Sequence, residues 1–308
     1  MVTDLSGHVP RTVPARFEVI DDRFAGVGGD AHMEVLFSAG RWLEGPVYVP
    51  AGRYVLFSDI PNDRVLRWDE TTGAVGVFQQ PAGYANGRTL DRTGRVASCR
   101  HGHRQVVRTE HDGSDTVLAS HHQGRRLNSP NDVVERADGT IWFTDPSYGI
   151  DSDYEGHRAD SEIGGCHVYR IEPSGDVSIV ADDFERPNGL AFSSDERQLY
   201  IADTRRRHVR RFDVSDDGSL SGGAVFADCD AGSFDGLRLD SHGRVWVAAH
   251  DGLHCFDPDG TLLGKLHVPE VVSNLTFGGA QRNHLFITAT TALYALRVNC
   301  SGATYPTG

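Results

Sequence analysis

The apolar residues of the chain occur in short runs that end at Gly, Asp, Asn or Pro. Runs such as 141–144 (IWFT) and 245–248 (VWVA) are rich in β-branched and aromatic residues, which favour strands. Long stretches with the 3.6-residue spacing of an amphipathic helix are missing. Glycine, which favours turns, is abundant at 35 residues. This pattern predicts an all-β protein of short strands joined by tight turns.

One pattern recurs six times along the chain. Each copy has an acidic or amide residue at its head, a short strand, a turn that commonly contains Gly, a second strand and usually two more strands. The heads are Glu44, Asn86, Asn131, Asn188, Asp235 and Asn274. They are separated by 42, 45, 57, 47 and 39 residues, and periods of about 40 to 50 residues are typical of propeller blades. The repeat predicts a six-bladed β-propeller with four-stranded blades.

The last copy has room for only about three strands before the chain ends. A strand near 32–37 (HMEVLF) would supply the fourth and close the ring, which removes two unpaired sheet edges. We therefore expect a single domain over 1–308, with an N-terminal extension at 1–43 that holds the closing strand. The longest interval is explained by a polar insertion at 149–165, which we expect to form a loop over the pocket.

The polar heads are unusual because each one begins a strand that is otherwise apolar. The first strand of a propeller blade lines the central channel, so the six heads should converge at one end of it. Two carboxylates and four amides form a set of hard oxygen ligands, which indicates a divalent cation and favours Ca²⁺ over Mg²⁺. The alternative is that the Asn-Gly and Asp-Gly pairs only form turns. Their recurrence at the blade period favours a shared site.

Charge and cysteine content narrow the possible partners. The net charge of −13 argues against nucleic acid or an anionic membrane, since both would repel this surface. The N-terminus lacks a basic segment followed by an apolar core, and no apolar run reaches membrane-spanning length. The five cysteines are scattered and never in C-x-x-C spacing, which argues against a disulfide framework. We expect a soluble cytoplasmic protein, a monomer or weak homodimer, that binds a small molecule.

Several short motifs together resemble a known family. They are WLEGPVY from 42, NSPNDVV from 128, FTDPSYG from 143, RPNGLAFS from 186 and FDGLRLDSHGRVWVA from 234. In combination they resemble the senescence marker protein/gluconolactonase/luciferin-regenerating enzyme family, and within it the bacterial gluconolactonases, from about residue 17 to about 298. The resemblance implies a six-bladed propeller with one catalytic divalent cation.

The family's motifs imply particular ligands in this chain. They assign the cation to Glu44, Asn188 and Asp235, and they assign Asn131 to the cation or to the substrate, depending on the member. Ca²⁺ is the expected ion, with Zn²⁺, Mn²⁺ or Mg²⁺ as alternatives. Animal members carry a substrate-binding Arg two residues before the Asn, where this chain has Ser129. The preference among lactones therefore does not carry over from those members, whereas the cation site is expected to be intact.

The resemblance predicts metal-dependent hydrolysis of sugar lactones, with D-glucono-1,5-lactone giving D-gluconate. The cation would polarise the lactone carbonyl, and Asp235 would also accept a proton from the attacking water. Asn86, Asn131 and Tyr148 would orient the sugar hydroxyls. His101 and His103 alternate as strand neighbours do, so both rings are expected on one face near the pocket mouth, with His103 as a substrate contact.

Other interpretations stay open at this point. The same cation and pocket would serve an organophosphate or aryl-ester hydrolase, and a propeller that binds calcium or sugar without turnover would share the ring of heads. Residues 151–162 (DSDYEGHRADSE) nearly fit an EF-hand loop, but strand-like segments flank them, so we expect an exposed acidic loop. The basic run 205–211 (RRRHVRR) is interpreted as a solvated edge strand.

Overall fold

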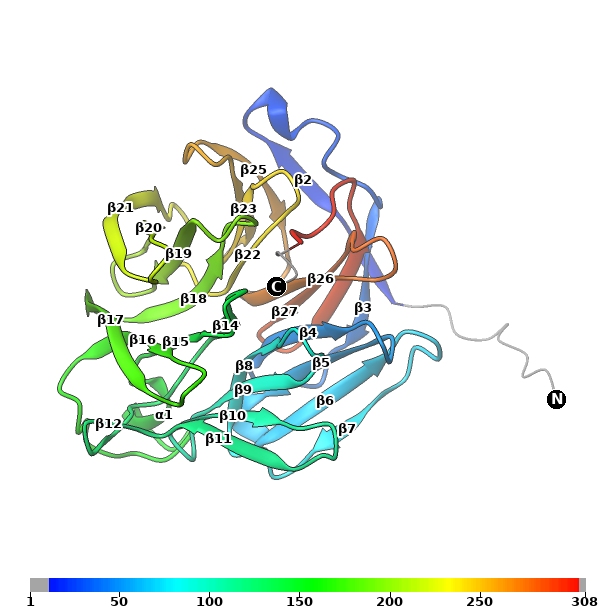
Figure 1. Ribbon diagram of the computed structural model, residues 1–308. Coiled ribbons are helices and arrows are strands. Elements are labelled where there is room, and N and C mark those ends of the chain that lie inside the picture. The colour runs from blue at the N-terminus through cyan, green and yellow to red at the C-terminus, as the bar shows by residue number, and fades with distance from the viewer. Residues whose placement is uncertain (1–10, 305–308) are drawn as a thin grey trace.

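The computed structural model describes residues 11–304 as a six-bladed β-propeller, which confirms the predicted fold class. Six antiparallel sheets follow one another around a central axis in chain order (Figure 1). The helical elements are short: α1 (Tyr148–Asp151), η1 (Asp22–Phe24) and η2 (Ile60–Asn62). Across 11–304, no helix has the length and apolarity that crossing a membrane requires.

Each blade is an antiparallel sheet, and its strands follow one another from the axis to the outer edge. Blade 1 contains β4 (Leu43–Val49), β5 (Tyr54–Asp59), β6 (Arg64–Asp69) and β7 (Val75–Gln79). Blade 2 contains β8 (Ala85–Leu90), β9 (Val96–Arg100), β10 (Gln105–Thr109) and β11 (Asp115–Ala119). Blade 3 contains β14 (Val133–Glu135), β15 (Ile141–Asp145), β16 (Cys166–Ile171) and β17 (Val177–Phe184). A two-stranded ribbon of β12 (His121–His122) and β13 (Arg125–Arg126) joins blades 2 and 3.

The second half of the ring repeats this arrangement. Blade 4 contains β18 (Pro187–Phe192), β19 (Gln198–Asp203), β20 (His208–Val214) and β21 (Leu220–Asp228). Blade 5 contains β22 (Leu237–Leu239), β23 (Val245–Ala249), β24 (Gly252–Phe256) and β25 (Leu262–His267). Blade 6 contains β26 (Val272–Gly278), β27 (His284–Ala289) and β28 (Leu293–Arg297), and it is completed from the N-terminus.

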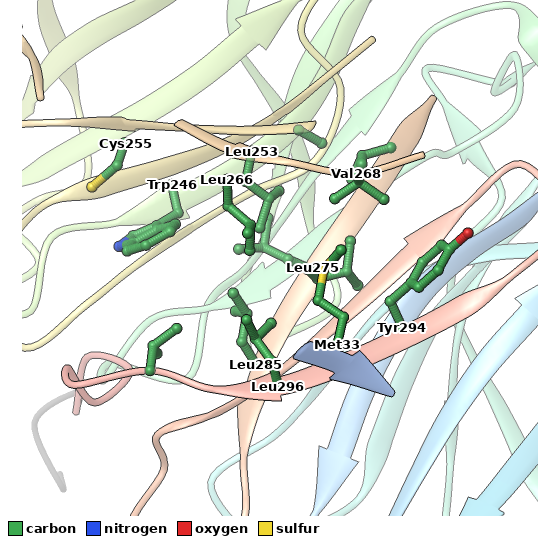
Figure 2. Packing of buried hydrophobic residues seen from close by; sticks show 14 of the residues in the cluster. Met33, Trp246, Leu253, Cys255, Leu266, Val268, Leu275, Leu285, Tyr294 and Leu296 are labelled. Atoms are coloured by element: carbon green, nitrogen blue, oxygen red, sulfur yellow. The ribbon is translucent and has the colours of Figure 1, made fainter. Parts of the chain in front are cut away.

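The N-terminal segment closes the ring, as the sequence predicted. Strand β3 (His32–Phe37) pairs with β28 in blade 6, with Val35 opposite Tyr294, and in Figure 1 it lies beside the other strands of that blade. Met33 is fully buried among residues of blades 5 and 6, including Leu285 and Leu296 (Figure 2). Burial of a Met side chain contributes about 1.5–3 kcal/mol, so side-chain packing secures the closure in addition to the backbone hydrogen bonds.

Two blades carry a fifth strand that the sequence did not predict. Strand β1 (Thr12–Pro14) pairs with β3 at the outer edge of blade 6, and β2 (Arg16–Val19) pairs with β25 at the outer edge of blade 5. The extension therefore covers two sheet edges that would otherwise present unpaired N–H and C=O groups. A three- or four-residue strand has too little periodicity to be recognised in isolation.

The inner strands explain the continuous apolar runs in the sequence. Strands β4, β15, β18, β23 and β27 are buried along their whole length, because neighbouring blades pack on both of their faces. Aromatic pairs join the blades, as where Trp142 meets Phe192 edge to face at 5.4 Å between ring centroids. The outer strands β7 and β11 are largely exposed. The polar heads therefore lie at the starts of strands whose other residues are buried between blades.

The interpretation of the basic run 205–211 as an edge strand is wrong. Strand β20 pairs with β19 on one side and β21 on the other, so it lies inside blade 4. The first three arginines precede the strand and form the turn after β19. Arginine side chains can extend their charged ends to water from a turn or from an inner strand, and charge alone therefore does not identify an edge.

Candidate functional site

Five of the six predicted heads line one cavity at an end of the central channel. Glu44, Asn86 and Asn188 lie within the first strands of blades 1, 2 and 4, and Asn131 and Asp235 lie just before the first strands of blades 3 and 5. The cavity has a volume of about 200 Å³. It is lined by Trp42, Glu44, Asn86, Asn131, Tyr148, Glu155, Asn188, Thr204, Ser233, Asp235, His250, Val271 and Val272.

The residue after a head is glycine in four blades, and contact between blades explains it. A Cβ atom at Gly87 would lie 2.4 Å from the carbonyl oxygen of Asn131, and one at Gly189 would lie 2.6 Å from that of Asp235. The Gly87 amide also donates a hydrogen bond to the Asn131 oxygen at 2.8 Å. These glycines let the head of the next blade approach, so the Asn-Gly and Asp-Gly pairs do more than form turns.

The sixth head, Asn274, supports the site from outside the cavity lining. Its side-chain nitrogen donates to the Glu44 Oε2 atom at 3.0 Å, and its Oδ1 atom accepts the Leu275 amide at 2.8 Å. The Gly45 amide also donates to Glu44 Oε2. Asn274 therefore orients the Glu44 carboxylate, and both of its own polar atoms are engaged.

Asn86 presents a free oxygen because a histidine fixes its amide. The Nδ1 atom of His101 lies 3.0 Å from the carbonyl oxygen of Glu155, which can only accept, so Nδ1 carries the proton. The Nε2 atom therefore accepts from Asn86 Nδ2 at 3.2 Å. Burial lowers the pKa of His101 to about 4, so the ring is neutral near pH 7. The Oδ1 atom of Asn86 is buried and has no hydrogen-bond donor within residues 11–304.

Three carboxyl groups line the cavity, and each of them has a raised pKa. Burial raises the pKa of Glu44 to about 7, and the nearby carboxylates add to the shift. Burial likewise raises the pKa of Glu155 to about 7, with a smaller contribution from Asp151. Burial followed by the charges of Glu44 and Glu155 raises the pKa of Asp235 well above its ordinary value. A cation among them would restore the ionised forms.

Two arginines in the channel partly balance these acids. Arg88 is fully buried and donates to the Gly45 carbonyl and the Ser58 hydroxyl at 2.7 Å each, and burial lowers its pKa to about 10. Arg238 pairs with buried Asp132 at 3.2 Å. Four carboxylates would be negatively charged when ionised: Glu44, Glu155, Asp235 and Asp132. The two guanidinium groups balance two of these charges, so two negative charges are left over. One divalent cation would neutralise that excess.

Tyr148 stands at the edge of the cavity in a hydrogen-bonded group. It begins the short helix α1, and it lines the cavity together with Thr204 and Asn188. Asn188 donates to Thr204 Oγ1 at 3.0 Å, and Thr204 donates to the Phe234 carbonyl at 2.9 Å. Burial and then the charge of Asp235 raise the pKa of Tyr148, so its hydroxyl stays protonated and can donate to a ligand.

His103 is not brought to this cavity, against the sequence prediction. Strand β9 ends at Arg100 and the chain turns over the next four residues, so His101 and His103 are not strand neighbours. His101 is fully buried behind Asn86, whereas His103 is exposed. Ser129 is buried and donates to the Pro146 carbonyl at 2.7 Å while it accepts the Gly149 amide, so it holds the start of the insertion.

Sequence reasoning missed several cavity residues, of which Glu155, Thr204, Ser233 and His250 have polar groups beyond the backbone. Thr204 and His250 directly follow the second strands of blades 4 and 5, as His101 does in blade 2. The second strand runs antiparallel to the first, so its last residue returns to the end of the channel where the heads lie. A search for polar residues right after each second strand would have found them. Glu155 lies in the irregular insertion, where no period applies.

A second acidic cluster lies outside the cavity, in blade 5. The side chains of Asp230, Asp251 and His254 lie close enough to share an ion. Lys265 Nζ already lies 2.7 Å and 2.9 Å from the Asp230 oxygens and 3.3 Å from Asp251. The ammonium group supplies the positive charge there, so this cluster is a lysine-centred ion pair network between β25 and two loops.

Comparison with known proteins assigns the chain to a protein family. The family model described as SMP-30/Gluconolactonase/LRE-like region matches residues 42–291. The chain belongs to this family. The match runs from just before Glu44 to the turn after β27, so the SMP-30/gluconolactonase/LRE-like region contains all six heads.

Two known lactonases resemble the chain over most of its length. A gluconolactonase from Zymomonas mobilis is 29% identical over 296 residues, covering 88% of this chain and 82% of that protein. A pentonolactonase from Haloferax volcanii is 29% identical over 265 residues, covering 82% and 83%. A solved structure of a gluconolactonase from Xanthomonas campestris superposes with a TM-score of 0.88 at 37% identity, covering 94% and 96% of the two chains.

Proposed function

We propose that this protein is a metal-dependent lactonase that hydrolyses sugar lactones, with D-glucono-1,5-lactone converted to D-gluconate. The observation that carries the proposal is the convergence of Glu44, Asn131, Asn188 and Asp235 in one cavity, beside the unpartnered Oδ1 atom of Asn86. The gluconolactonase relatives from Zymomonas mobilis and Xanthomonas campestris support the substrate.

The side chains present fit a hard divalent cation. Carboxylate and amide oxygens are the ligands that Ca²⁺ accepts in irregular geometry, and the excess negative charge in the channel matches a divalent ion. Glu44, Asn188 and Asp235 would hold it, with Asn131 as a fourth ligand or a substrate contact. When bound, a divalent cation supplies a Lewis acid that polarises the lactone carbonyl. Ca²⁺ is the proposed ion, with Zn²⁺, Mn²⁺ and Mg²⁺ as alternatives.

The chain's own residues manage the protons of the reaction. Water attacks the lactone carbonyl carbon, one of its protons passes to Asp235, and the bond from that carbon to the ring oxygen breaks. The ring oxygen then takes up a proton. Glu155 lines the same cavity and is placed to donate it in its protonated form.

Three further groups would hold the sugar. The Asn86 Oδ1 atom accepts from a sugar hydroxyl, and it stays aimed at the cavity because His101 binds the other side of the amide. Tyr148 offers its protonated hydroxyl as a donor. The Asn131 side chain is 5% exposed and lines the cavity, so it is placed to contact a bound sugar or the cation.

Proton release from glucono-1,5-lactone, corrected for spontaneous hydrolysis, tests this function. The metal-stripped protein should give the spontaneous rate, and one of Ca²⁺, Zn²⁺, Mn²⁺ or Mg²⁺ should restore a saturable enzymatic rate. If gluconolactones and pentonolactones are hydrolysed only at the spontaneous rate with every ion, the proposal is refuted. Turnover of an aryl ester or an organophosphate in place of the lactones would instead support a hydrolase for those substrates. The cytoplasmic location and the monomeric or weakly dimeric state stay predictions.

A further inference from the structure

A broad depression continues from the channel cavity toward the surface. Its volume is about 870 Å³, several times that of the cavity. Four residues line both spaces: Tyr148, Thr204, Ser233 and His250. A ligand that reaches into the cavity therefore has its outer part in this depression.

The depression has the opposite charge character to the cavity. Three arginines, Arg186, Arg205 and Arg207, line it together with two carboxylates, Asp151 and Glu185. The cavity by contrast has three carboxylates in its lining and no arginine or lysine among the described residues. This cationic wall is also unusual for a chain with a net charge of −13.

The two carboxylates are already engaged by guanidinium groups. Asp151 pairs with Arg186 at 2.6 Å, and the Arg186 guanidinium lies over the Tyr148 ring at 4.9 Å from its centroid. Glu185 pairs with Arg206 at 3.3 Å, and Arg206 is not part of the lining. Neither carboxylate therefore neutralises the remaining two arginines of the wall.

Arg205 and Arg207 are left as positive charges without a carboxylate partner in the described part of the chain. The Arg205 side chain makes no hydrogen bond or ion pair there, and Arg207 only donates to the Cys229 carbonyl at 3.4 Å. Both side chains are exposed and lie in the turn between β19 and β20, directly after Thr204. A guanidinium is a planar fork of donors that matches carboxylate, sulfonate and phosphate oxygens.

We propose that the preferred substrate is an aldonolactone with an anionic group at the end away from the lactone carbonyl, held by Arg205 and Arg207. The inference rests on the proposed lactonase function, because it assigns the lactone end of the ligand to the channel cavity. Thr204 then lies between the two parts of the ligand, as a residue common to both spaces. The positive wall also attracts an anion toward a protein that would otherwise repel it.

Steady-state kinetics with three lactones test the proposal. Glucono-1,5-lactone is the neutral probe, a lactone of glucaric acid carries a carboxylate, and 6-phosphogluconolactone carries a phosphate. At least one anionic lactone should have a kcat/KM roughly 10-fold above that of the neutral one, the effect of one charge-assisted contact. Replacing both arginines, Arg205→Ala with Arg207→Ala, should raise KM for that lactone by about this factor and leave kcat nearly unchanged.

Arg197→Ala is the matched control. Arg197 is exposed, in the turn between β18 and β19 of the same blade, and does not line the depression. This variant loses one positive charge from the same blade, where the double variant loses two, and it should keep the preference. Higher salt should weaken the preference of the parent protein for the anionic lactone and have little effect on the variant that lacks Arg205 and Arg207. A preference for the neutral lactone, or equal KM changes for all three lactones, would overturn the proposal.

A binding measurement separates this proposal from the lactonase function itself. Calorimetry on Asp235→Asn loaded with cation should find D-glucarate, which has a carboxylate at both ends, bound about 10-fold more tightly than D-gluconate. Removal of Arg205 and Arg207 should abolish the difference. If the two acids bind equally well to Asp235→Asn, the anion site is refuted even where lactones are hydrolysed. If glucarate binds tightly through the arginines and no lactone is turned over, the lactonase function fails and only anion binding by Arg205 and Arg207 is supported.

Discussion

The Nε2 atom of His101 accepts a hydrogen bond from Asn86 Nδ2 at 3.2 Å, and this bond decides which atom of Asn86 faces the cavity. The proton on the other ring nitrogen is held by the Glu155 carbonyl at 3.0 Å. One buried histidine therefore links the insertion to a blade-two head. It acts as a positioning residue, since it reaches the ligand only through Asn86.

His101→Leu should raise KM for the lactone by roughly 10-fold, because the Asn86 amide loses the acceptor that fixes its orientation. His101→Gln can keep an acceptor at the Nε2 position and should stay within about 3-fold of the parent protein by the same scale. Steady-state kinetics on both variants, with cation content measured in parallel, check this. Equal effects of Leu and Gln would contradict the proposed role.

The glycines after the heads should tolerate no side chain. A Cβ at Gly87 would lie 2.4 Å from the Asn131 carbonyl oxygen and 2.5 Å from the Asp132 side chain. Gly87→Ala should therefore lower the free energy of unfolding by about 1–3 kcal/mol and weaken cation binding. Gly76→Ala, on the exposed strand β7 where a Cβ meets nothing within 4 Å, is the control and should be nearly neutral. Denaturant titration of both variants measures the difference; equal losses would contradict the close-approach argument.

The six heads and the closing strand could be predicted because both follow from a period. First strands line the channel, so a polar residue at each blade repeat has to lie at the axis. Whether a head faces the cavity depends on contacts from other blades, as with Asn274, which turns to Glu44. The sequence contains no direct record of such contacts.

Predictions that assumed a strand would continue were wrong. His103 was placed beside His101 by strand alternation, but β9 ends at Arg100 and the alternation ends with it. The basic run 205–211 was assigned to a sheet edge because of its charge, but its strand β20 pairs on both sides inside blade 4. Strand ends are set by where the next blade packs, which local sequence encodes weakly, and Glu155 lies in an insertion that no repeat governs.

The stability of the metal-free protein should fall as the pH rises. Burial raises the pKa of Glu44 from 4.5 to about 7, so between these values the unfolded chain releases its proton before the folded one. Glu155 acts in the same direction. Bound cation reverses the effect, because it favours the ionised carboxylates. The gain in melting temperature on adding Ca²⁺ should therefore increase from about pH 5 to pH 8; a gain independent of pH would contradict the site.

Glu155→Gln should separate a catalytic role of the insertion from a structural one. The backbone carbonyl that holds His101 remains, so KM and cation content should change little, while kcat falls by about 10²-fold if Glu155 donates the proton to the ring oxygen. Deletion of 151–162 would also remove the His101 contact and should raise KM. An unchanged kcat in Glu155→Gln would show that a group other than Glu155 donates the proton.

The most direct measurement is the rate of glucono-1,5-lactone hydrolysis as a function of Ca²⁺ concentration for the parent protein, Glu44→Gln and Asp235→Asn. Glu44→Gln keeps an oxygen ligand without its charge, so its curve should shift to higher Ca²⁺ and recover much of the maximal rate. Asp235→Asn should saturate at a rate lower by roughly 10²- to 10⁴-fold, since it lacks the proton acceptor. Equal rescue of both variants would show that Asp235 is only a ligand, and full activity of the chelated parent protein would contradict the metal-dependent mechanism.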